Sequence, residues 1–252
     1  MLKRLLFLFI AMVVASQAPL AQAQNEAYPD SLDQAVQQIQ ALPWEHENKD
    51  YVLSRSHSTI GLPDNFFLLR NQSARKFMFL NHGIRQPDTE AVLFNPDTIN
   101  QIIFSYHETG YVTLNSWSDL DSDQILKTIT QLTEKDNVSR RQHGLDEAKV
   151  LGWIQEPTLD RQNQTVHWIF SLKEGPRKMV NAVVIKLGRK GFERIIWVAP
   201  YSIYKSSDGL IQQVMAKHSF QSNFRYADRT VSDRMAGFGI ANLVNAITGN
   251  GN

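Results

Sequence analysis

The sequence contains no cysteine among its 252 residues. This absence excludes disulfides, thiolate metal ligands and a cysteine nucleophile, so the fold must be held together by its apolar core. Long apolar runs are missing as well. After position 23 no apolar run is long enough for a membrane-spanning helix, so we predict none in that part of the chain. The formal net charge is only +1, so nothing favours long-range attraction to nucleic acid, which we do not expect as a partner.

Catalytic and cofactor motifs are also absent. The seven histidines are scattered, with no two within five positions, so no zinc-binding spacing exists. The sequence has neither a G-x-S-x-G nucleophile elbow nor a Walker loop. A Ser-x-x-Lys pattern at residues 202–205 lacks the partner motifs that give it catalytic meaning. We therefore expect no metal and no cofactor, and the sequence identifies no catalytic residue.

The N-terminal segment 1–23 has the three parts of a secretory signal peptide. Lys3 and Arg4 form a positive start, residues 5–15 are apolar, and residues 21–23 read Ala-Gln-Ala, a small-residue cleavage site. This apolar stretch is too short to cross a bilayer, which needs about 20 residues. We expect cleavage and export to the periplasm or cell envelope, where loss of two cations lowers the net charge from +1 to −1. A retained segment would instead anchor the protein to the membrane.

The rest of the chain divides simply. Residues 24–48 read as a polar linker and a short helix that begins with a capping box of Ser31 and Gln34. Residues 49–248 read as a single α+β domain, and residues 249–252 form a tail. A hydrophobic content of 42% is an ordinary globular value and supplies a core for this length.

Strands dominate the pattern between residues 49 and 199. Residues 148–199 alternate with period two and predict a four-stranded antiparallel meander, whose last hairpin turns at residues 188–191. In residues 165–172 one face carries Val166, Trp168 and Phe170, while the other carries polar side chains, including His167. Earlier strands are predicted at 51–70, 91–94, 99–106 and 111–114.

Four further helices are predicted. Asn71 caps a helix that closes near Gly83, and Asp121 begins the clearest helix, which stops near Gly144. Within it, residues 135–143 are either a solvated helix end or a loop. Ser207 or Asp208 caps a helix at 210–215, and a capping-box pattern at 230–233 starts a last helix that includes residues 236–247. Strands and helices without strict alternation predict an α+β fold, with helices packed on an antiparallel sheet.

A set of ordered residues in the second half resembles a known family. It includes Gly110-Tyr111-Val112, Asn137, Arg140 or Arg141, Gly144, Gly152-Trp153, Pro157, Asp160, Trp168, Asn181, the run 187–191, Phe220, Tyr226, Asp228, Asp233, Ala236, Gly239 and Leu243. The set is similar to the family called domain of unknown function 2167 and covers about residues 50–248. The resemblance implies a membrane-anchored bacterial protein and brings no known activity.

Candidate binding residues come from loops and sheet faces. Trp153 is a candidate for an aromatic groove, and Asp160 is either a ligand contact in a loop or the start of an Asx turn. Arg189, with Lys190 and Arg194, makes a basic hairpin that touches an acidic lipid head group or a partner, or is a solvated turn. The remaining candidates, as binding residues or structural hydrogen-bonders, are Asn137, Arg140, Tyr226 and Asp228.

Two functions follow as hypotheses. The first is a non-catalytic envelope module that binds a protein, a peptide or a lipid surface, the last by peripheral membrane contact. The second is a hydrolase or transferase on envelope glycans or peptides that uses Glu108, Asp160 and a histidine. The missing catalytic motifs favour the first.

Overall fold

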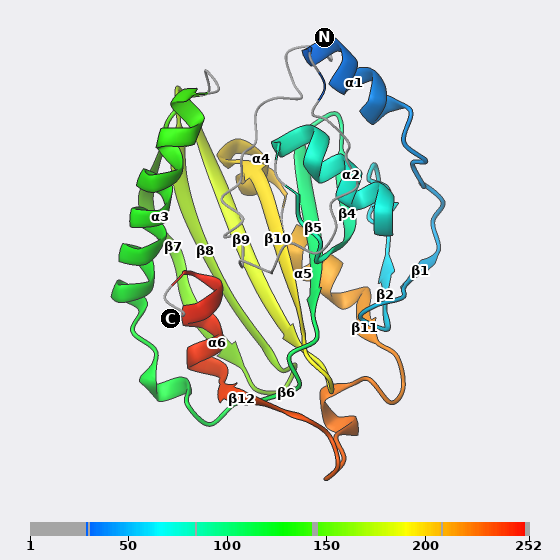
Figure 1. Ribbon diagram of the computed structural model, residues 1–252, viewed down its shortest axis with the longest axis vertical. Helices are drawn as coiled ribbons and strands as arrows, with labels where there is room; N and C mark the ends of the chain where they lie inside the picture. The colour runs from blue at the N-terminus through cyan, green and yellow to red at the C-terminus, as the bar shows by residue number, and fades with distance from the viewer. Residues whose placement is uncertain (1–28, 30, 84, 143–145, 208, 250–252) are drawn as a thin grey trace.

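The centre of the molecule is a seven-stranded antiparallel sheet (Figure 1). The computed structural model describes residues 29, 31–83, 85–142, 146–207 and 209–249. In spatial order the strands of the large sheet are β3 (Phe67–Arg70), β4 (Thr89–Asn95), β5 (Asn100–His107), β10 (Phe192–Pro200), β9 (Arg177–Leu187), β8 (Thr165–Glu174) and β7 (Ala148–Asp160). The predicted meander at 148–199 is therefore confirmed as β7 to β10, and three earlier strands extend it beyond β10.

Two smaller sheets complete the β structure. Strands β1 (Asp50–Leu53), β2 (Ser58–Gly61) and β11 (His218–Phe220) form an antiparallel sheet in that order. Strand β6 (Tyr111–Thr113) pairs in parallel with β12 (Met235–Gly239). The predicted strand at 111–114 thus exists, but it leaves the large sheet and joins the C-terminal part of the chain.

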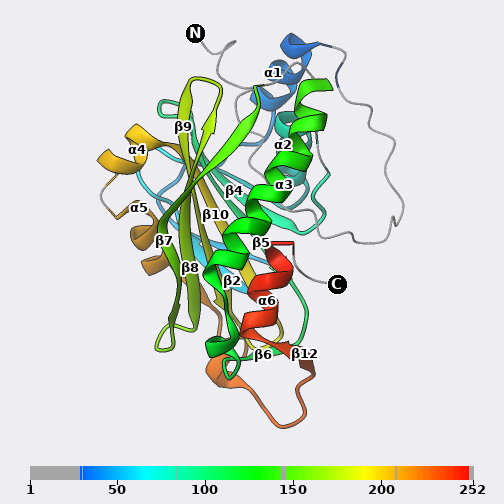
Figure 2. The ribbon, with the colours of Figure 1, turned by 90° about the vertical axis from the view of Figure 1, so that its left-hand side faces the viewer.

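Helices and the small sheet cover both faces of the large sheet (Figure 2). One face carries α1 (Leu32–Gln40), α2 (Asn71–His82), α3 (Ser122–Gln142) and α6 (Ile240–Ile247). The opposite face carries the small sheet β1–β2–β11 together with α4 (Tyr201–Ser206) and α5 (Leu210–Ala216). Short 3-10 turns lie at Trp117–Asp119 and Tyr226–Asp228. The arrangement is an α+β fold with helices packed on an antiparallel sheet, as the sequence pattern predicts.

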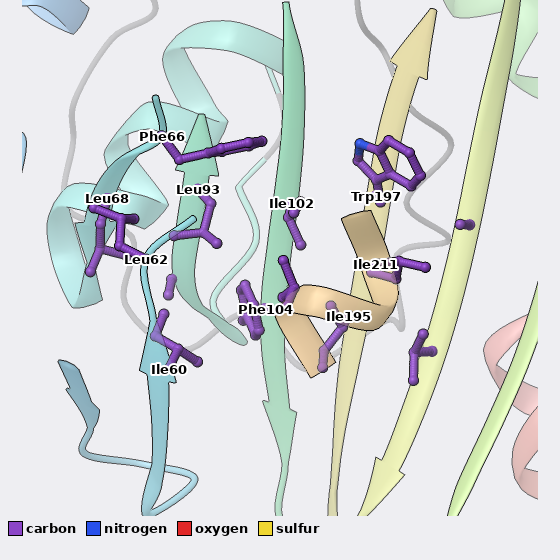
Figure 3. Close-up of a cluster of buried hydrophobic side chains, with 14 of the residues drawn as sticks. Ile60, Leu62, Phe66, Leu68, Leu93, Ile102, Phe104, Ile195, Trp197 and Ile211 are labelled. Atoms are coloured by element: carbon purple, nitrogen blue, oxygen red, sulfur yellow. The ribbon is translucent and has the colours of Figure 1, made fainter. Parts of the chain in front are cut away.

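Alternating side chains of the same strands supply the two cores. In β8, Trp168 and Phe170 point to the face under α3 and α6, and Ile169 between them points to the other face. Figure 3 shows the core on that second face, where Ile102, Phe104 and Trp197 meet side chains of the small sheet and α5. Because both faces are covered, the central strands are apolar nearly throughout.

No helix in the described ranges is long and apolar enough to cross a membrane. The signal-peptide segment and the expected helix stop at Gly144 lie outside those ranges, as do Asp208 and most of the tail. The capping box at Ser31 is confirmed on one side, because the Ser31 hydroxyl accepts the Gln34 backbone N–H at 3.3 Å. Asp121 likewise accepts the Gln124 N–H at 3.0 Å and begins α3.

The prediction of one long C-terminal helix is wrong in its first half. Residues 230–233 form a turn in which the Asp233 carboxylate accepts the Thr230 N–H at 2.7 Å, and residues 235–239 are extended as β12. The helix proper begins only at Ile240. Two glycines explain the difference, because Gly237 has a φ of +73° and Gly-x-Gly has low helix propensity, while pairing with β6 satisfies the extended backbone.

Smaller corrections concern helix ends. Helix α2 begins at Asn71 itself, with no side-chain cap, and ends at Gly83 in the left-handed conformation, as expected. Helix α5 follows Gly209, also left-handed, and no side-chain hydrogen bond caps it. Helix α4 was not predicted. Residues 135–142 stay helical, because the inward face of this stretch is polar and bonded rather than apolar.

Candidate functional site

A pocket of about 420 Å³ lies on the face of the large sheet that α5 partly covers. This volume falls in the range of about 300 to 1,000 Å³ that is typical of small-molecule pockets. The pocket lies between strands β7 to β9 and one side of α5. Its lining residues are Gln155, Asp160, Asn163, Thr165, His167, Trp168, Ile169, Ala182, Val183, Val184, Lys186, Ile211, Gln212, Met215 and Ala216.

The floor of the pocket is apolar. Ile169, Ala182 and Val184 belong to the core on this face and are almost fully buried. Ile169 on β8 lies directly opposite Ala182 on β9. Val184, two residues further along β9, lies opposite His167 and therefore on the same face. Ile211 and Met215 of α5 form the opposite wall, four residues apart on one helix face. An aliphatic group is therefore the part of a ligand that this floor accepts.

The rim is polar and carries a histidine of altered pKa. The His167 Nε2 atom lies 2.7 Å from the Gln155 side-chain nitrogen, so the imidazole accepts from the amide in the neutral tautomer with its proton on Nδ1. Burial lowers the pKa of His167, and the Asp160 charge opposes this only in part. The ring is thus neutral near pH 7 and offers hydrogen bonds rather than charge.

Lys186 also lines the pocket, and its side chain is bonded to the small sheet. Its Nζ donates to the His218 carbonyl at 2.6 Å, and burial lowers its pKa, against the attraction of the Glu193 carboxylate. The Glu193 carboxylate lies 2.6 Å from the His218 Nε2 with both side chains fully buried, which joins the small sheet to the large one. Lys186 therefore lines the pocket with its Nζ already bonded within the fold.

Asp160 is the one predicted site residue that the pocket contains. Its Oδ1 accepts the backbone N–H groups of Gln162 and Asn163 at 2.9 and 3.0 Å, which is the Asx turn that the sequence left as one alternative. The Asn163 amide also donates to Oδ2 at 2.6 Å and, as the largest cause, lowers the pKa of Asp160. Asp160 thus shapes the rim, and a ligand contact stays a prediction.

The structure does not bring Glu108 and Asp160 together. Asp160 pairs with Thr165, which pairs with Lys186 on β9, and Lys186 pairs with Glu193, the partner of Tyr106 on β5. Four strand spacings separate the β7 and β5 positions, or roughly 19 Å at about 4.8 Å each. Glycoside chemistry requires about 5 to 9.5 Å between two carboxyl groups. The proposed acid pair of the hydrolase hypothesis is therefore contradicted.

Asn137 and Arg140 lie elsewhere, on the inner side of α3. The Asn137 amide exchanges two 2.8 Å hydrogen bonds with the backbone of Ala148, at the start of β7. Arg140 donates from Nε to the Asp146 carbonyl at 2.7 Å and forms a buried ion pair with Glu174. Both side chains are buried and bonded within the fold, and neither lines the pocket.

Trp153 lies on β7 and faces the core under α3. Its ring meets Phe170 edge-on, with 6.3 Å between centroids, so the ring packs against the core rather than lining the pocket. Asp228 accepts the Arg225 N–H at 3.1 Å and closes a 3-10 turn. Both have a structural explanation, and their binding roles stay predictions.

Tyr226 and Arg189 hold the segment before β12 in place. The Tyr226 hydroxyl donates to the Val112 carbonyl at 2.8 Å, its ring stacks on Tyr111, and burial together with Tyr111 raises its pKa. Arg189 binds both Asp233 oxygens, at 2.7 and 2.8 Å. The predicted basic hairpin is correspondingly smaller than expected, because Arg189 is ion-paired, Arg194 is buried, and only Lys190 is exposed.

Sequence reasoning missed the pocket itself. A signal was present, because Thr165 and His167 place polar side chains on a face of β8 that a second core layer otherwise occupies. The strand pattern does not show that α5 packs opposite this face, where it forms the far wall of the pocket. Among the residues that the structure describes, no group of three or more His, Asp or Glu side chains is placed to hold a metal ion.

Comparisons with known proteins give one family and several distant folds. No curated protein matches the chain. Among solved structures it is similar to PsbP (CyanoP) from Synechocystis sp. PCC 6803, with 10% identity, a TM-score of 0.40, and coverage of 69% of this chain and 92% of that one. It is also similar to the Ran-binding protein Mog1p of Saccharomyces cerevisiae, with 14% identity, a TM-score of 0.36, and coverage of 70% and 96%.

A protein from Bacteroides thetaiotaomicron VPI-5482 has 11% identity and a TM-score of 0.35, with coverage of 70% of this chain and 50% of that one. The family comparison is much broader in its coverage. A model of the family described as protein of unknown function (DUF2167) matches residues 45–250, which is most of the chain. This agrees with the ordered residues that suggested the resemblance. The chain is therefore a member of the DUF2167 family.

Proposed function

We propose that this protein is exported to the cell envelope and acts there as a non-catalytic binding module. Its partner is a peptide or an exposed segment of another protein that inserts an aliphatic side chain into the pocket between β7–β9 and α5. The pocket carries the proposal, because an apolar floor and a rim of hydrogen-bonding side chains suit an apolar group on a polar backbone.

The rim and the floor of the pocket would recognise different parts of a peptide, its backbone and an apolar side chain. Gln155, Asn163 and Gln212 offer amide groups that can both donate to and accept from a peptide backbone. Ile169, Val184 and Ile211 offer the apolar contacts. A flat lipid surface does not reach a recessed floor, so a peptide fits this site better than a bilayer. The separation of Glu108 from Asp160 removes the acid pair on which the hydrolase alternative depended.

Selection from a displayed random peptide library tests the pocket. We expect the full chain to enrich peptides with a Leu, Ile or Val anchor. The Ala216→Trp variant places a large ring at the pocket wall, at an exposed position of α5, and should weaken these peptides at least tenfold. Gln213→Trp is the matched control, because Gln213 is exposed on the same helix and does not line the pocket.

Two results would count against the pocket. Selected peptides that bind the Ala216→Trp and Gln213→Trp variants equally well use another surface. Enrichment without any apolar anchor would contradict the assigned role of the floor. Amide chemical shifts of Gln155, Asn163 and Ile169 on addition of a selected peptide would locate the contact directly.

Export is tested separately. The sequence of residues 1–23 predicts a mature N-terminus at Gln24 and recovery of the protein outside the cytoplasm. N-terminal sequencing of protein purified from envelope fractions measures both. Protein that retains Met1 and remains in the cytoplasm would contradict export and leave the pocket proposal unaffected.

A further inference from the structure

One end of the molecule carries exposed cations around an exposed aliphatic side chain. We call this end the basic tip and define it as the hairpin turn 187–191 together with residues 222–235. In both views the segment that leads into β12 projects beyond the lower end of the large sheet (Figures 1 and 2). The two parts are joined by a bridge between Gly188 and Arg225 and by a hydrogen bond from the Arg189 N–H to the Phe224 carbonyl at 2.9 Å.

In the basic tip, the cations are mostly exposed and the carboxylates are not. Its exposed charged side chains are all cations: Lys190, Arg225, Arg229 and Arg234. Its two carboxylates turn inward, Asp233 onto Arg189 and the Thr230 N–H, and Asp228 onto the Arg225 N–H. Arg189 and the hydrogen bond from Thr230 hold the pKa of Asp233 well below its usual range, so this inward pair persists at any physiological pH.

Two charged residues of opposite sign border the tip. Glu108 is exposed at the border, where its carbonyl accepts from Arg234 at 2.7 Å. Arg161, in the turn after β7, is exposed and close enough to Tyr226 for its charge to oppose a part of the rise in the Tyr226 pKa. Within the tip itself, five Lys and Arg side chains stand against two carboxylates, so its formal charge is +3 and it presents a net positive surface.

Val231 is the most exposed large hydrophobic side chain of this surface. It is 101% exposed, the largest exposed fraction among the exposed large hydrophobic side chains of the described ranges, and Met235 nearby is 43% exposed. A fully exposed β-branched side chain contributes nothing to the fold, since it contacts no core. Aliphatic side chains ringed by Arg and Lys are the combination that an anionic bilayer surface attracts.

The tip is held in one shape. Arg189 alone links three parts of it, through Asp233, the Thr230 hydroxyl at 3.2 Å and the Asn223 carbonyl at 3.2 Å. The Arg229 guanidinium lies 4.9 Å from the centre of the Tyr111 ring, which stacks on Tyr226. Ordering this segment therefore costs little at binding, and the remaining N–H groups of each exposed guanidinium can donate to phosphate oxygens.

From this arrangement we infer that the basic tip docks the protein on an anionic lipid surface, with Val231 inserted among the head groups. This site is separate from the peptide pocket, and either can be wrong without the other. It also differs from the basic hairpin that the sequence suggested. The expected cations there were Arg189, Lys190 and Arg194, whereas the exposed cations of the tip are Lys190, Arg225, Arg229 and Arg234.

A single introduced cysteine tests the insertion, since the chain has none of its own. The full-length Val231→Cys variant, labelled with the environment-sensitive dye NBD, should show a blue-shifted and brighter emission with vesicles of phosphatidylcholine and phosphatidylglycerol mixed two to one. Vesicles of phosphatidylcholine alone, and the addition of concentrated salt, should each abolish the change. Val52→Cys is the control, because Val52 is an exposed valine of β1 and should not respond.

Charge removal gives a second measurement. Arg225→Gln with Arg229→Gln should lower the partition onto anionic vesicles roughly 25-fold, at about fivefold for each cation near the surface. Lys135→Gln with Lys149→Gln removes two exposed charges outside the tip and should change it less than about twofold.

Several results would overturn the inference. One is a silent label at residue 231 while the protein still sediments with vesicles, which would assign membrane contact to another segment such as residues 1–23. Another is an equal response at residues 52 and 231, or with uncharged vesicles. A response to poly-L-glutamate without any response to vesicles would assign the tip to an acidic protein surface instead.

Discussion

Asn137 and Arg140 lie three residues apart on α3, and both hold the start of β7. Asn137 binds the N–H and the carbonyl of Ala148, as a neighbouring strand would, and Arg140 reaches Asp146 and Glu174. From the sequence alone, such residues are candidates for binding, because polar side chains near a loop often contact ligands. Their burial assigns them to the fold instead, and stability measurements can check this.

Arg140→Met should lower the free energy of unfolding by about 3 kcal/mol, because it leaves Glu174 buried with only Arg177 as a charged partner. Urea unfolding measures the change. The double variant Arg140→Met with Glu174→Leu should recover much of it, since both charges are then gone. Arg141→Met is the control and should cost less than about 0.5 kcal/mol, because its ion pair with Glu147 is exposed. An unchanged stability for Arg140→Met would contradict the structural role.

His107 should make the protein less stable as the pH falls from about 6.5 to about 4. Burial, then the charge of Arg194, lowers its pKa to about 4, while Asp88 opposes this and Arg55 adds to it. The unfolded chain therefore takes up a proton in this range that the folded chain does not, at a cost of up to about 1.4 kcal/mol per pH unit.

His107→Phe keeps the stacking on Phe192, which has 4.8 Å between ring centroids, and removes the titration. Urea unfolding at pH 7.5, 6 and 5 should therefore give a flatter pH dependence for this variant. Identical slopes for the variant and the natural chain would show that other groups cause the acid sensitivity.

At the scale of elements, the C-terminal region shows how a strand replaces half of an expected helix. Strand β12 is extended because β6 offers it a parallel partner, and Gly110 lets the two approach. Gly110 has a φ of +95°, and a Cβ there would lie 2.7 Å from the Arg234 carbonyl oxygen. The same backbone leads from the basic tip into α6, so this contact positions both.

Gly110→Ala should destabilise the β6–β12 pair by about 2 kcal/mol or more, from backbone strain and the clash together. Hydrogen exchange should show faster exchange at residues 111–113 and 235–239. Gly209→Ala is a matched control, since Gly209 also has a positive φ of +69° but a Cβ there meets only the Gln212 side chain at 3.8 Å. Its effect should be smaller and confined to the start of α5. Equal effects of the two variants would show that strain alone, without the clash, explains the loss.

At the scale of the whole molecule, the large sheet is covered unevenly. Helices cover one face from α2 to α3, whereas the other face is shared by the small sheet, α4 and α5 (Figure 2). The pocket lies where this second cover ends, over β7 to β9. The outer strands of the meander are thus only partly covered on this face.

Ligand binding at such a site should stabilise the whole fold. A selected peptide at 100 times its Kd should raise the free energy of unfolding by about 2.7 kcal/mol, which corresponds to roughly 5 to 10 °C in Tm for a domain of this size. Differential scanning calorimetry measures the shift. At the same peptide concentration the Ala216→Trp variant, which binds at least tenfold more weakly, should gain no more than about 1.4 kcal/mol. A full shift in that variant would place the peptide elsewhere.

The sequence alone determined most elements and the fold class. The alternation of Val166, Trp168 and Phe170 predicted β8 and the sheet face, and Ser31 and Asp121 predicted two helix starts. These signals are local, since a strand period or a cap involves neighbours in the chain. Of the proposed pocket, only Asp160 was among the predicted site residues, and the polar face of residues 165–171 was noted without its partner wall.

Tertiary structure decided everything that depends on distant pairing. The pairing of β10 with β5 separates Glu108 from Asp160, the pairing of β12 with β6 prevents a longer last helix, and Asp233 neutralises Arg189 from 44 residues away. Period and capping patterns carry no information on register between segments far apart in the chain. That register is set by the burial and hydrogen bonding of the complete fold, and it decides which polar residues face a pocket, an ion pair or the solvent.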